Sequence, residues 1–187
     1  VDTFGTLWLE QGLKNLPAIA KIPSIKTLSE SFVGLPVVII SPGPSLDKNI
    51  HLLSSLKGRV LLVATAQAAK ALHRAQIVPD IVAVADPGDI AYFLDGVDAS
   101  EIDALMVGVC CNPDFFNIYG PRFKHTFCFN ANTQVDRWVS ELFGDTTFIS
   151  SGGSISLDCI FIAMHWKCKE IILVGQDLSF ADGKQYS

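Results

Sequence analysis

Polar residues recur in this sequence where short apolar runs end. The first example is residues 41–45 (Ser-Pro-Gly-Pro-Ser), which follow Val-Val-Ile-Ile, and a second is residues 150–154 (Ser-Ser-Gly-Gly-Ser). Each stretch precedes a segment whose apolar residues have helical spacing. Because the first turn of a helix presents backbone N–H groups and attracts negative charge, either stretch could bind a phosphate.

The first stretch is expected to form a stiff turn. Pro42 and Pro44 each fix φ and remove a backbone donor. Gly43 can adopt a φ that other residues avoid, and it would let a ligand approach the backbone. Ser45 is expected to cap the following helix, with Asp47 in its first turn. The alternative is an ordinary capped turn without a ligand.

The second stretch could bind a ligand in the same way. Ser151, Gly152 and Gly153 precede a strongly apolar helical segment. Their hydroxyl and backbone N–H groups could hold a second anionic group or a ribose. The alternative is a flexible capped turn.

Further polar residues follow the other predicted strands. They are Thr65, Gln67, Asp86, Asn112, Asn130 and Asp177. The set is poor in charge, which favours hydrogen bonding to a sugar, base or phosphate, and no metal site is predicted from it. Asp86 and Asp177 could orient a hydroxyl, bind Mg²⁺ or act as a base, and Asp177 is the candidate catalytic residue. A purely structural role is the alternative for each.

Established nucleotide motifs are missing from the first turn. No Gly-Lys-Ser/Thr follows it, and no G-x-G-x-x-G fingerprint occurs. The second strand ends in Ala-Thr-Ala rather than in the acid that would bind a ribose 2′-hydroxyl. NAD is therefore disfavoured.

The composition limits the class of protein. The 187 residues are 49% hydrophobic and 18% charged, with a net charge of −5 and no basic run. We expect no nucleic-acid partner, since phosphate contacts need clustered Lys and Arg. No apolar run approaches the ~20 residues of a membrane helix, so no membrane partner is expected. The five cysteines form no C-x-x-C pair, which favours buried thiols in a cytoplasmic protein over a zinc or redox site.

From Val37 onward, predicted strands alternate with predicted helices. The strands are expected at 37–40, 60–64, 81–85, 104–109, 125–129, 146–149 and 171–174, and the helices at 46–56, 66–75, 90–94, 135–143 and 155–166. Continuous apolar strands joined through helices are typical of a parallel sheet covered on both faces. The sequence therefore predicts an α/β fold, a doubly wound, mostly parallel Rossmann-like sheet with its ligand at the carboxyl ends of the strands.

Residues 1–36 are expected to form an N-terminal helical arm or linker before a Rossmann-like domain at 37–187. The arm could dock an upstream domain or form a helical cap over the active face. Because the chain starts at Val1 and stops at Ser187 without a terminal helix, we expect a fragment of a longer protein.

Three segments together resemble a known family. They are VVIISPGPSLDKNIHLL (37–53), AQIVPDIVAVADP (75–87) and SSGGSISLDCIFIAMHWKCKEIILVGQDLSFADGK (150–184). They resemble the core domain of motility-associated factor (Maf) proteins, which are linked to flagellin glycosylation. The same domain family includes archaeal 6-hydroxymethyl-dihydropterin diphosphokinase-like proteins, and the domain is similar to bacterial sialyltransferases that use CMP-sialic acid.

The resemblance implies roles for both stretches. Gly43, Pro44 and Ser45 would lie by the nucleotide phosphate or ribose, and Ser151, Gly152 and Gly153 by the cytidine and phosphate. The sequence departs from its relatives at Pro42, which is often small or polar there. It also reads Gln185-Tyr186 where many Maf-like sequences have Thr-His. The sialyltransferase histidine would lie beyond Ser187, so the general base is expected outside this chain.

Three functions remain open at this point. The first is a glycosyltransferase that takes a CMP-activated nonulosonic acid of the pseudaminic or legionaminic type and modifies Ser or Thr of flagellin, with no cofactor required. The second is a 6-hydroxymethyl-7,8-dihydropterin diphosphokinase-like enzyme that uses ATP and Mg²⁺, with Asp86 and Asp177 as candidate metal ligands. The third is a non-catalytic nucleotide-binding module.

Overall fold

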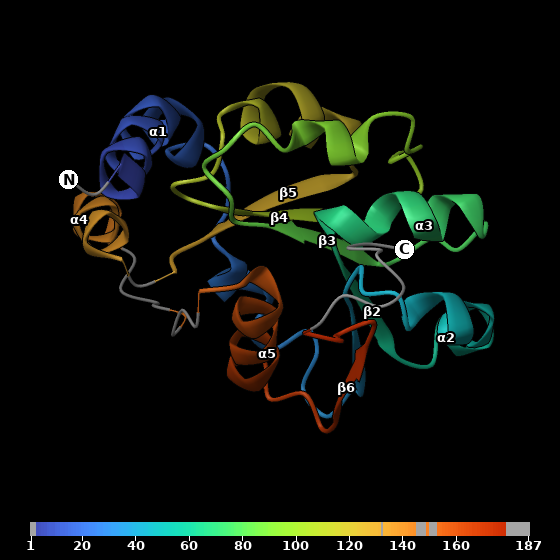
Figure 1. Ribbon diagram of the computed structural model, residues 1–187. Helices are drawn as coiled ribbons and strands as arrows, with labels where there is room; N and C mark the ends of the chain where they lie inside the picture. Colours follow the sequence, from blue (N-terminus) through green and yellow to red (C-terminus); the bar gives the residue numbers. More distant parts are fainter. Residues whose placement is uncertain (1–2, 132, 145–148, 150–152, 179–187) are drawn as a thin grey trace.

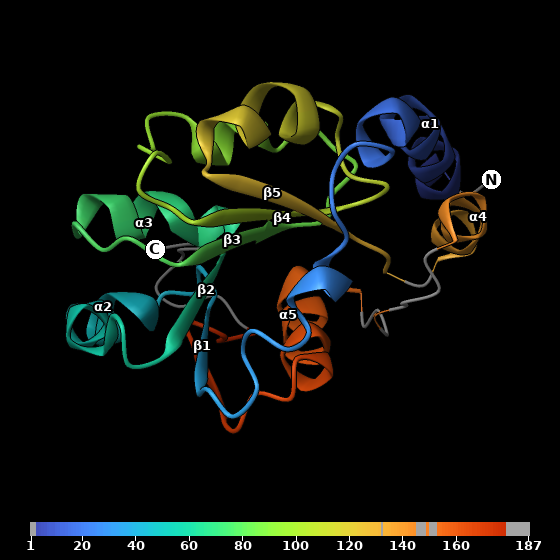
Figure 2. The ribbon, with the colours of Figure 1, turned by 180° about the vertical axis from the view of Figure 1, so that it is seen from behind.

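The described residues form one six-stranded sheet. The structure, a computed structural model, describes residues 3–131, 133–144, 149 and 153–178. The strands are β1 (Val37–Ile40), β2 (Leu61–Thr65), β3 (Ile81–Val84), β4 (Ala104–Gly108), β5 (His125–Phe129) and β6 (Ile171–Val174). Their order is β5-β4-β3-β2-β1-β6, and each described pair is parallel (Figures 1 and 2).

Five α-helices and several short helical segments accompany the sheet. The α-helices are α1 (Thr3–Ile19), α2 (Leu46–Leu53), α3 (Ala69–Arg74), α4 (Gln134–Phe143) and α5 (Ile155–His165). The 3₁₀ segments are Ile25–Leu28, Ser54–Leu56, Ala66–Ala68, Ala91–Leu94 and Gly120–Arg122, and Phe115–Tyr119 is a π-helical turn.

The two faces of the sheet are buried under different helices. On one face Val38 and Leu62, which are paired in register, lie in a core that includes Leu46 and Leu53 of α2. On the other face Ile39 lies in a core that includes residues of α5. Because β1, β2, β3 and β4 are buried on both sides, their sequences are continuous apolar runs rather than alternating ones. This confirms the predicted doubly wound Rossmann-like fold.

The predicted elements match the observed ones except near their ends. The strands at 125–129 and 171–174 have the predicted bounds, whereas the predicted helices at 46–56 and 66–75 each divide into an α-helix and a 3₁₀ segment. The turn at Phe115–Tyr119 was not predicted, because its helical character is only five residues long and depends on buried aromatic side chains. The predicted strand at 146–149 lies outside the described residues apart from Ile149.

Residues 3–36 pack against the sheet. Ile19 at the end of α1 and Ile25 of the following 3₁₀ segment are both buried in the core. In α1, Gln11 Nε2 donates to the carbonyl of Pro87 (3.1 Å), and Asn15 Nδ2 donates to the carbonyls of Val109 (3.0 Å) and Cys111 (2.7 Å). Since these carbonyls follow β3 and β4, α1 covers the carboxyl ends of those strands, as the predicted cap would.

Candidate functional site

A cavity of about 360 Å³ opens at the carboxyl ends of β3 and β4. Six parts of the chain line it. They are Trp8 of α1, Gln67, residues 84–87 and Ile90 at and after the end of β3, Gly108 and Cys110 at and after the end of β4, Ala131, Thr133 and Asp136 around the start of α4, and Gly153, Ser154, Ile155 and Asp158 at the start of α5. The predicted location of the site, at the strand ends, therefore coincides with a real hollow.

The N-terminus of α5 forms one wall of this cavity. Ser154 has an extended backbone (φ −143°, ψ 145°), and its hydroxyl accepts a hydrogen bond from the amide of Leu157 at 3.4 Å. Gly153 precedes it with φ +82°, a conformation that strongly favours glycine. An eleven-residue helix starting at a cavity wall favours an anionic group there.

Carboxylates also line the cavity. Asp136 is buried, and its Oδ2 accepts from the amide of Thr133 (2.8 Å) in a capping box. Asp86 is half-buried, and its Oδ1 accepts from the amide of Gly88 (2.7 Å). Asp158 is buried as well, and no Lys, Arg or His is among the described residues that line the cavity. These walls are therefore rich in hydrogen-bond acceptors.

Cys110 shares this acidic environment. Its Sγ donates to Asp136 Oδ1 at 3.5 Å. Burial raises the pKa of the Cys110 thiol, and the neighbouring Asp136 charge raises it further. The thiol is therefore protonated at neutral pH and is not an activated nucleophile.

The first turn is filled by the chain itself. The amide of Ser45 donates to Asp177 Oδ2 at 2.7 Å, and the amide of Gly43 donates to the carbonyl of Gly175 at 2.8 Å. A Cβ on Gly43 would lie 2.5 Å from Gly175 O and 2.6 Å from Asp177 Oδ2. The hydrogen bonds from Ser45 lower the pKa of Asp177. An intramolecular carboxylate therefore lies where a ligand anion was predicted.

Ser45 is the N-cap residue of α2, as predicted, but the turn differs from a simple capped turn in two details. The side chain of Ser45 makes no capping hydrogen bond, because its own backbone is already helical (φ −68°, ψ −16°). Gly43 is not among the glycines with positive φ. Glycine fits at position 43 because Gly175 and Asp177 approach too closely for a side chain.

The first turn nevertheless contacts the start of α5. Buried Ser41, directly after β1, bonds through its hydroxyl to the hydroxyl of Ser156 in α5 at 2.8 Å. The same hydroxyl donates to Gln176 Oε1 at 2.7 Å. Ser41 thus joins the ends of β1 and β6 to the first turn of α5. Of the two turns, only the second lines the cavity.

Asp86 and Asp177 lie at separate places on this edge. They follow β3 and β6, which are three strand positions apart, or about 14 Å at the usual strand spacing. That separation is too large for both carboxylates to bind one Mg²⁺ ion directly. Within the described part of the chain, no group of three or more His, Cys, Asp or Glu side chains could hold a metal ion.

The remaining predicted residues have other positions. Thr65 is buried at the end of β2 and does not line the cavity. Asn112 Nδ2 donates to the carbonyl of Gly88 at 3.3 Å, which fixes a loop beside the cavity. Asn130 lines a second cavity instead. Ser151 and Gly152 lie outside the described residues.

Trp8, Asp136 and Asp158 are among the cavity-lining residues that sequence reasoning missed. The Thr-Gln-Val-Asp stretch that ends at Asp136 is a capping-box pattern and could have indicated a helix start. Trp8 reaches the cavity only because α1 folds over the strand ends, and no local pattern indicates that.

A doubly wound α/β domain with a helix N-terminus facing a cavity at the strand ends is typical of nucleotide-binding proteins. The family described as 6-hydroxymethylpterin diphosphokinase MptE-like matches residues 10–183. The chain therefore belongs to the MptE-like family, as the sequence resemblance predicted.

One known protein is similar to the chain in sequence, and one solved structure is similar in fold. The chain is 29% identical over 170 residues to a 6-hydroxymethyl-7,8-dihydropterin pyrophosphokinase of Methanocaldococcus jannaschii, an alignment that covers 88% of this chain and 68% of that protein. Its fold is similar to the Maf glycosyltransferase of Magnetospirillum magneticum AMB-1, with a TM-score of 0.69 at 18% identity. That match covers 96% of this chain and 29% of the longer glycosyltransferase chain.

The described helices were also tested for membrane spans. None of them combines the length and the apolar character that crossing a bilayer requires.

Proposed function

We propose that this domain binds a nucleotide-activated donor in the cavity beside α5 and takes part in group transfer. The observation that carries the proposal is that the N-terminus of α5 and carboxylates from other elements line one cavity. The N-terminus of α5 favours a phosphate, while Asp86 and Asp136 offer acceptors to hydroxyl or amino groups of the same ligand. The volume of about 360 Å³ is in the range of ligand sites.

The donor that we propose is a CMP-activated nonulosonic acid of the pseudaminic or legionaminic type. Its phosphate would lie at Gly153 and Ser154, and the amino group of cytosine or the sugar hydroxyls would donate to the carboxylates. The similar fold of a Maf glycosyltransferase supports this choice. The acceptor that we propose is a Ser or Thr hydroxyl of flagellin.

In the proposed reaction the acceptor oxygen forms a bond to the anomeric carbon of the sugar. The bond from that carbon to the phosphate oxygen breaks, and CMP leaves with the electron pair. Positive potential at the start of α5 would stabilise the charge on the leaving phosphate. The acceptor proton passes to a base. Asp177 does not serve as this base in the proposal, because it is bonded to Ser45 and lies outside the cavity.

A diphosphokinase-type reaction is the second candidate. The family and the 29% identical pyrophosphokinase favour it, and the carboxylates of the cavity could accept hydrogen bonds from the amino group of a pterin. This reaction would use ATP with Mg²⁺. Since the described residues form no metal site of their own, the ion would have to arrive bound to the ATP phosphates.

Calorimetric titration separates these candidates. We expect CMP to bind the wild-type protein without Mg²⁺, and Gly153→Val to weaken binding at least tenfold, because valine strongly disfavours φ +82°. Gly58→Val is the matched control, since Gly58 has φ +78° and nothing within 4 Å of its Cβ position, and it does not line the cavity. Binding of ATP with Mg²⁺, with no heat from millimolar CMP, would overturn the donor proposal in favour of the second candidate.

A further inference from the structure

Two side chains in the cavity beside α5 keep hydrogen-bonding atoms that the protein does not use. Within the described part of the chain, Asp86 forms its one side-chain hydrogen bond through Oδ1, and the amide group of Gln67 forms none. Both residues are half-buried, and neither Asp86 Oδ2 nor the Gln67 amide is among the enclosed atoms that lack a partner. These atoms are therefore accessible to a ligand in the cavity that both residues line.

The surrounding backbone fixes the orientation of Asp86. Its Oδ1 accepts from the amide of Gly88 at 2.7 Å. The turn that carries both residues is itself held by Asn112, whose backbone amide donates to the carbonyl of Asp86 (3.1 Å) and whose Nδ2 donates to the carbonyl of Gly88 (3.3 Å). Because Oδ1 is engaged by the backbone, Oδ2 is the oxygen that is left for a ligand, and an ionised carboxylate accepts hydrogen bonds but does not donate them.

Helix α1 adds an aromatic residue to the same cavity. Trp8 lines the cavity, and Gln11, Gly12 and Asn15 follow it on one face of the helix. Gln11 and Asn15 bond to carbonyls that follow β3 and β4, and a Cβ on Gly12 would lie only 3.0 Å from Val135 Cγ1. This close packing fixes Trp8 at the cavity, where its indole ring offers a flat surface to a heterocycle.

We propose that these residues recognise the base of the nucleotide, and that Asp86 selects cytosine over uracil. The proposal rests on the nucleotide-binding function proposed above. The 4-amino group of cytosine donates to Asp86 Oδ2, whereas uracil would place a carbonyl oxygen against the carboxylate with no proton between them. Gln67 has both a donor and an acceptor, so it pairs with either base and adds affinity without selecting between them. Trp8 packs against the face of the ring.

Calorimetric titration with CMP, UMP and ribose 5-phosphate, which lacks a base, tests this assignment. We expect the wild-type protein to bind CMP about tenfold more tightly than UMP, since a hydrogen bond to a charged group is gained with one base and a repulsion with the other. Asp86→Asn should reverse the preference. The amide of Gly88 would hold the oxygen of the new side chain, so its NH₂ group would replace Oδ2 and donate to O4 of uracil.

Two control variants accompany this test. Asp89→Asn removes a charge from an exposed neighbour that does not line the cavity, and it should leave the preference for CMP unchanged. Trp8→Leu should weaken CMP and UMP binding equally without changing that of ribose 5-phosphate. Trp138→Leu should change none of the three affinities, because Trp138 is a partly exposed residue of α4 outside the cavity.

The possible failures are distinguishable. Equal wild-type affinity for CMP and UMP, or a preference for CMP that persists in Asp86→Asn, would overturn the role of Asp86 and leave the nucleotide site in place. A loss of ribose 5-phosphate binding in Asp86→Asn as large as the loss of CMP binding would also overturn it, because Asp86 would then contact the sugar. A protein that binds neither nucleotide at millimolar concentration would overturn the proposed function, and the base assignment with it.

Discussion

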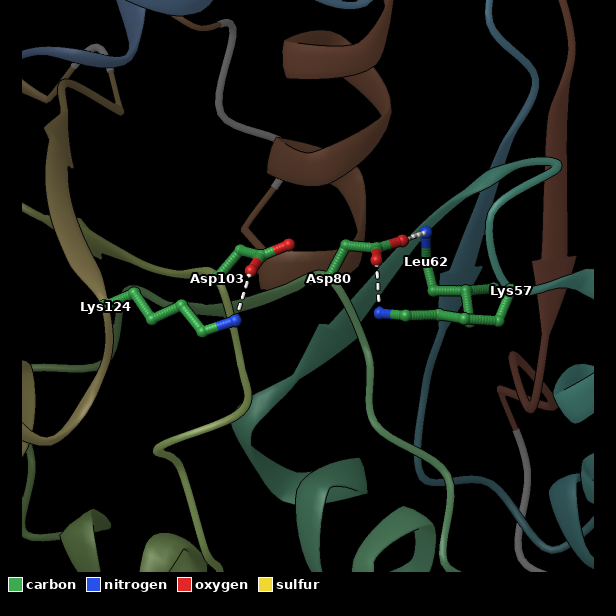
Figure 3. Close-up of polar contacts among 5 residues, drawn as sticks. All are labelled: Lys57, Leu62, Asp80, Asp103 and Lys124. Atoms are coloured by element: carbon green, nitrogen blue, oxygen red, sulfur yellow. Dashed lines mark hydrogen bonds and ion pairs between the residues drawn. The ribbon is translucent and has the colours of Figure 1, made fainter.

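The two ends of the parallel sheet treat their carboxylates differently. At the amino ends, Asp103 before β4 forms an ion pair with Lys124 at 2.9 Å, as Figure 3 shows. Asp80 before β3 forms an ion pair with Lys57, and its Oδ2 accepts from the amide of Leu62 at 2.8 Å. Both carboxylates therefore have a lysine partner within the same chain.

At the carboxyl ends the cavity contains Asp86, Asp136 and Asp158, with no Lys, Arg or His among the described residues that line it. The bonds to Asp86 and Asp136 described above come from backbone amides and a thiol rather than from cations. We infer that the amino ends are organised for stability, whereas the carboxyl ends retain acceptor capacity for a ligand.

The largest expected effect tests how tightly the carboxyl ends of β1 and β6 are packed. Gly175→Ala should lower the free energy of unfolding by about 3 kcal/mol or more, because Gly175 has φ +71° and the new Cβ would lie 2.0 Å from Ser41 O. Gly96→Ala has the same kind of φ (+77°) in open space and should cost only about 1–2 kcal/mol. Urea denaturation measures both, and equal losses would show that the contact with Ser41 does not matter.

The next prediction compares one carboxylate from each end of the sheet. Asp80→Asn should lower stability by about 1 kcal/mol, through the partly exposed pair with Lys57, and leave CMP affinity unchanged. Asp86→Asn should keep the stability within about 0.5 kcal/mol of wild type, because the amide oxygen can still accept from the amide of Gly88. The same substitution should weaken CMP binding about tenfold. Thermal melts and calorimetry measure the two effects. If Asp80→Asn weakened CMP binding as much as Asp86→Asn, the division between the two ends would be wrong.

A smaller effect concerns pH. Hydrogen bonds from Ser45 lower the folded-state pKa of Asp177. The stability that Asp177 contributes is therefore present above the ordinary Asp pKa of about 3.9, and it is lost as the pH falls through the lowered pKa. The pKa of Lys124 is raised by Asp103, so its contribution is present below about 10.4 and is lost as pH rises through the raised value.

Two variants test the acid effect and the alkaline effect separately. Asp177→Asn should flatten the acid side of the stability curve alone, and Lys124→Met should flatten the alkaline side alone. In NMR spectra the amide of Ser45 should titrate together with Asp177. A Ser45 amide signal that does not change with pH would contradict the hydrogen bond.

The smallest effect is a difference in thiol reactivity. Burial raises the pKa of Cys110 at the carboxyl ends, where Asp136 raises it further, whereas burial alone raises that of half-buried Cys168 before β6. Iodoacetamide at pH 8 should therefore modify Cys168 first, as mass spectrometry of digested protein would show. Faster modification of Cys110 would mean that its cavity is more open and less acidic than described.

The sequence was sufficient to predict the fold, because the central strands β1 to β4 are buried on both faces and appear as continuous apolar runs. It also predicted the helix that begins after Ser154, since a Ser-Gly run before an apolar segment is a local signal. The contact of Asp177 with the first turn could not be predicted, because it joins segments 132 residues apart. For the same reason, the sequence alone did not show why position 43 is glycine. Gly43 is needed because Gly175 and Asp177 approach its backbone closely, not because of its φ.

NMR mapping of CMP binding on the uniformly ¹⁵N-labelled wild-type protein tests the ligand-binding role of the carboxyl ends most directly. We expect the largest shifts at the amides of Gly153–Ser156 and Asp86–Gly88, and none at Asp80, Asp103 or Lys124. Shifts concentrated at the amino ends of the strands, or no shifts at millimolar CMP, would contradict the assignment of this cavity as the donor site.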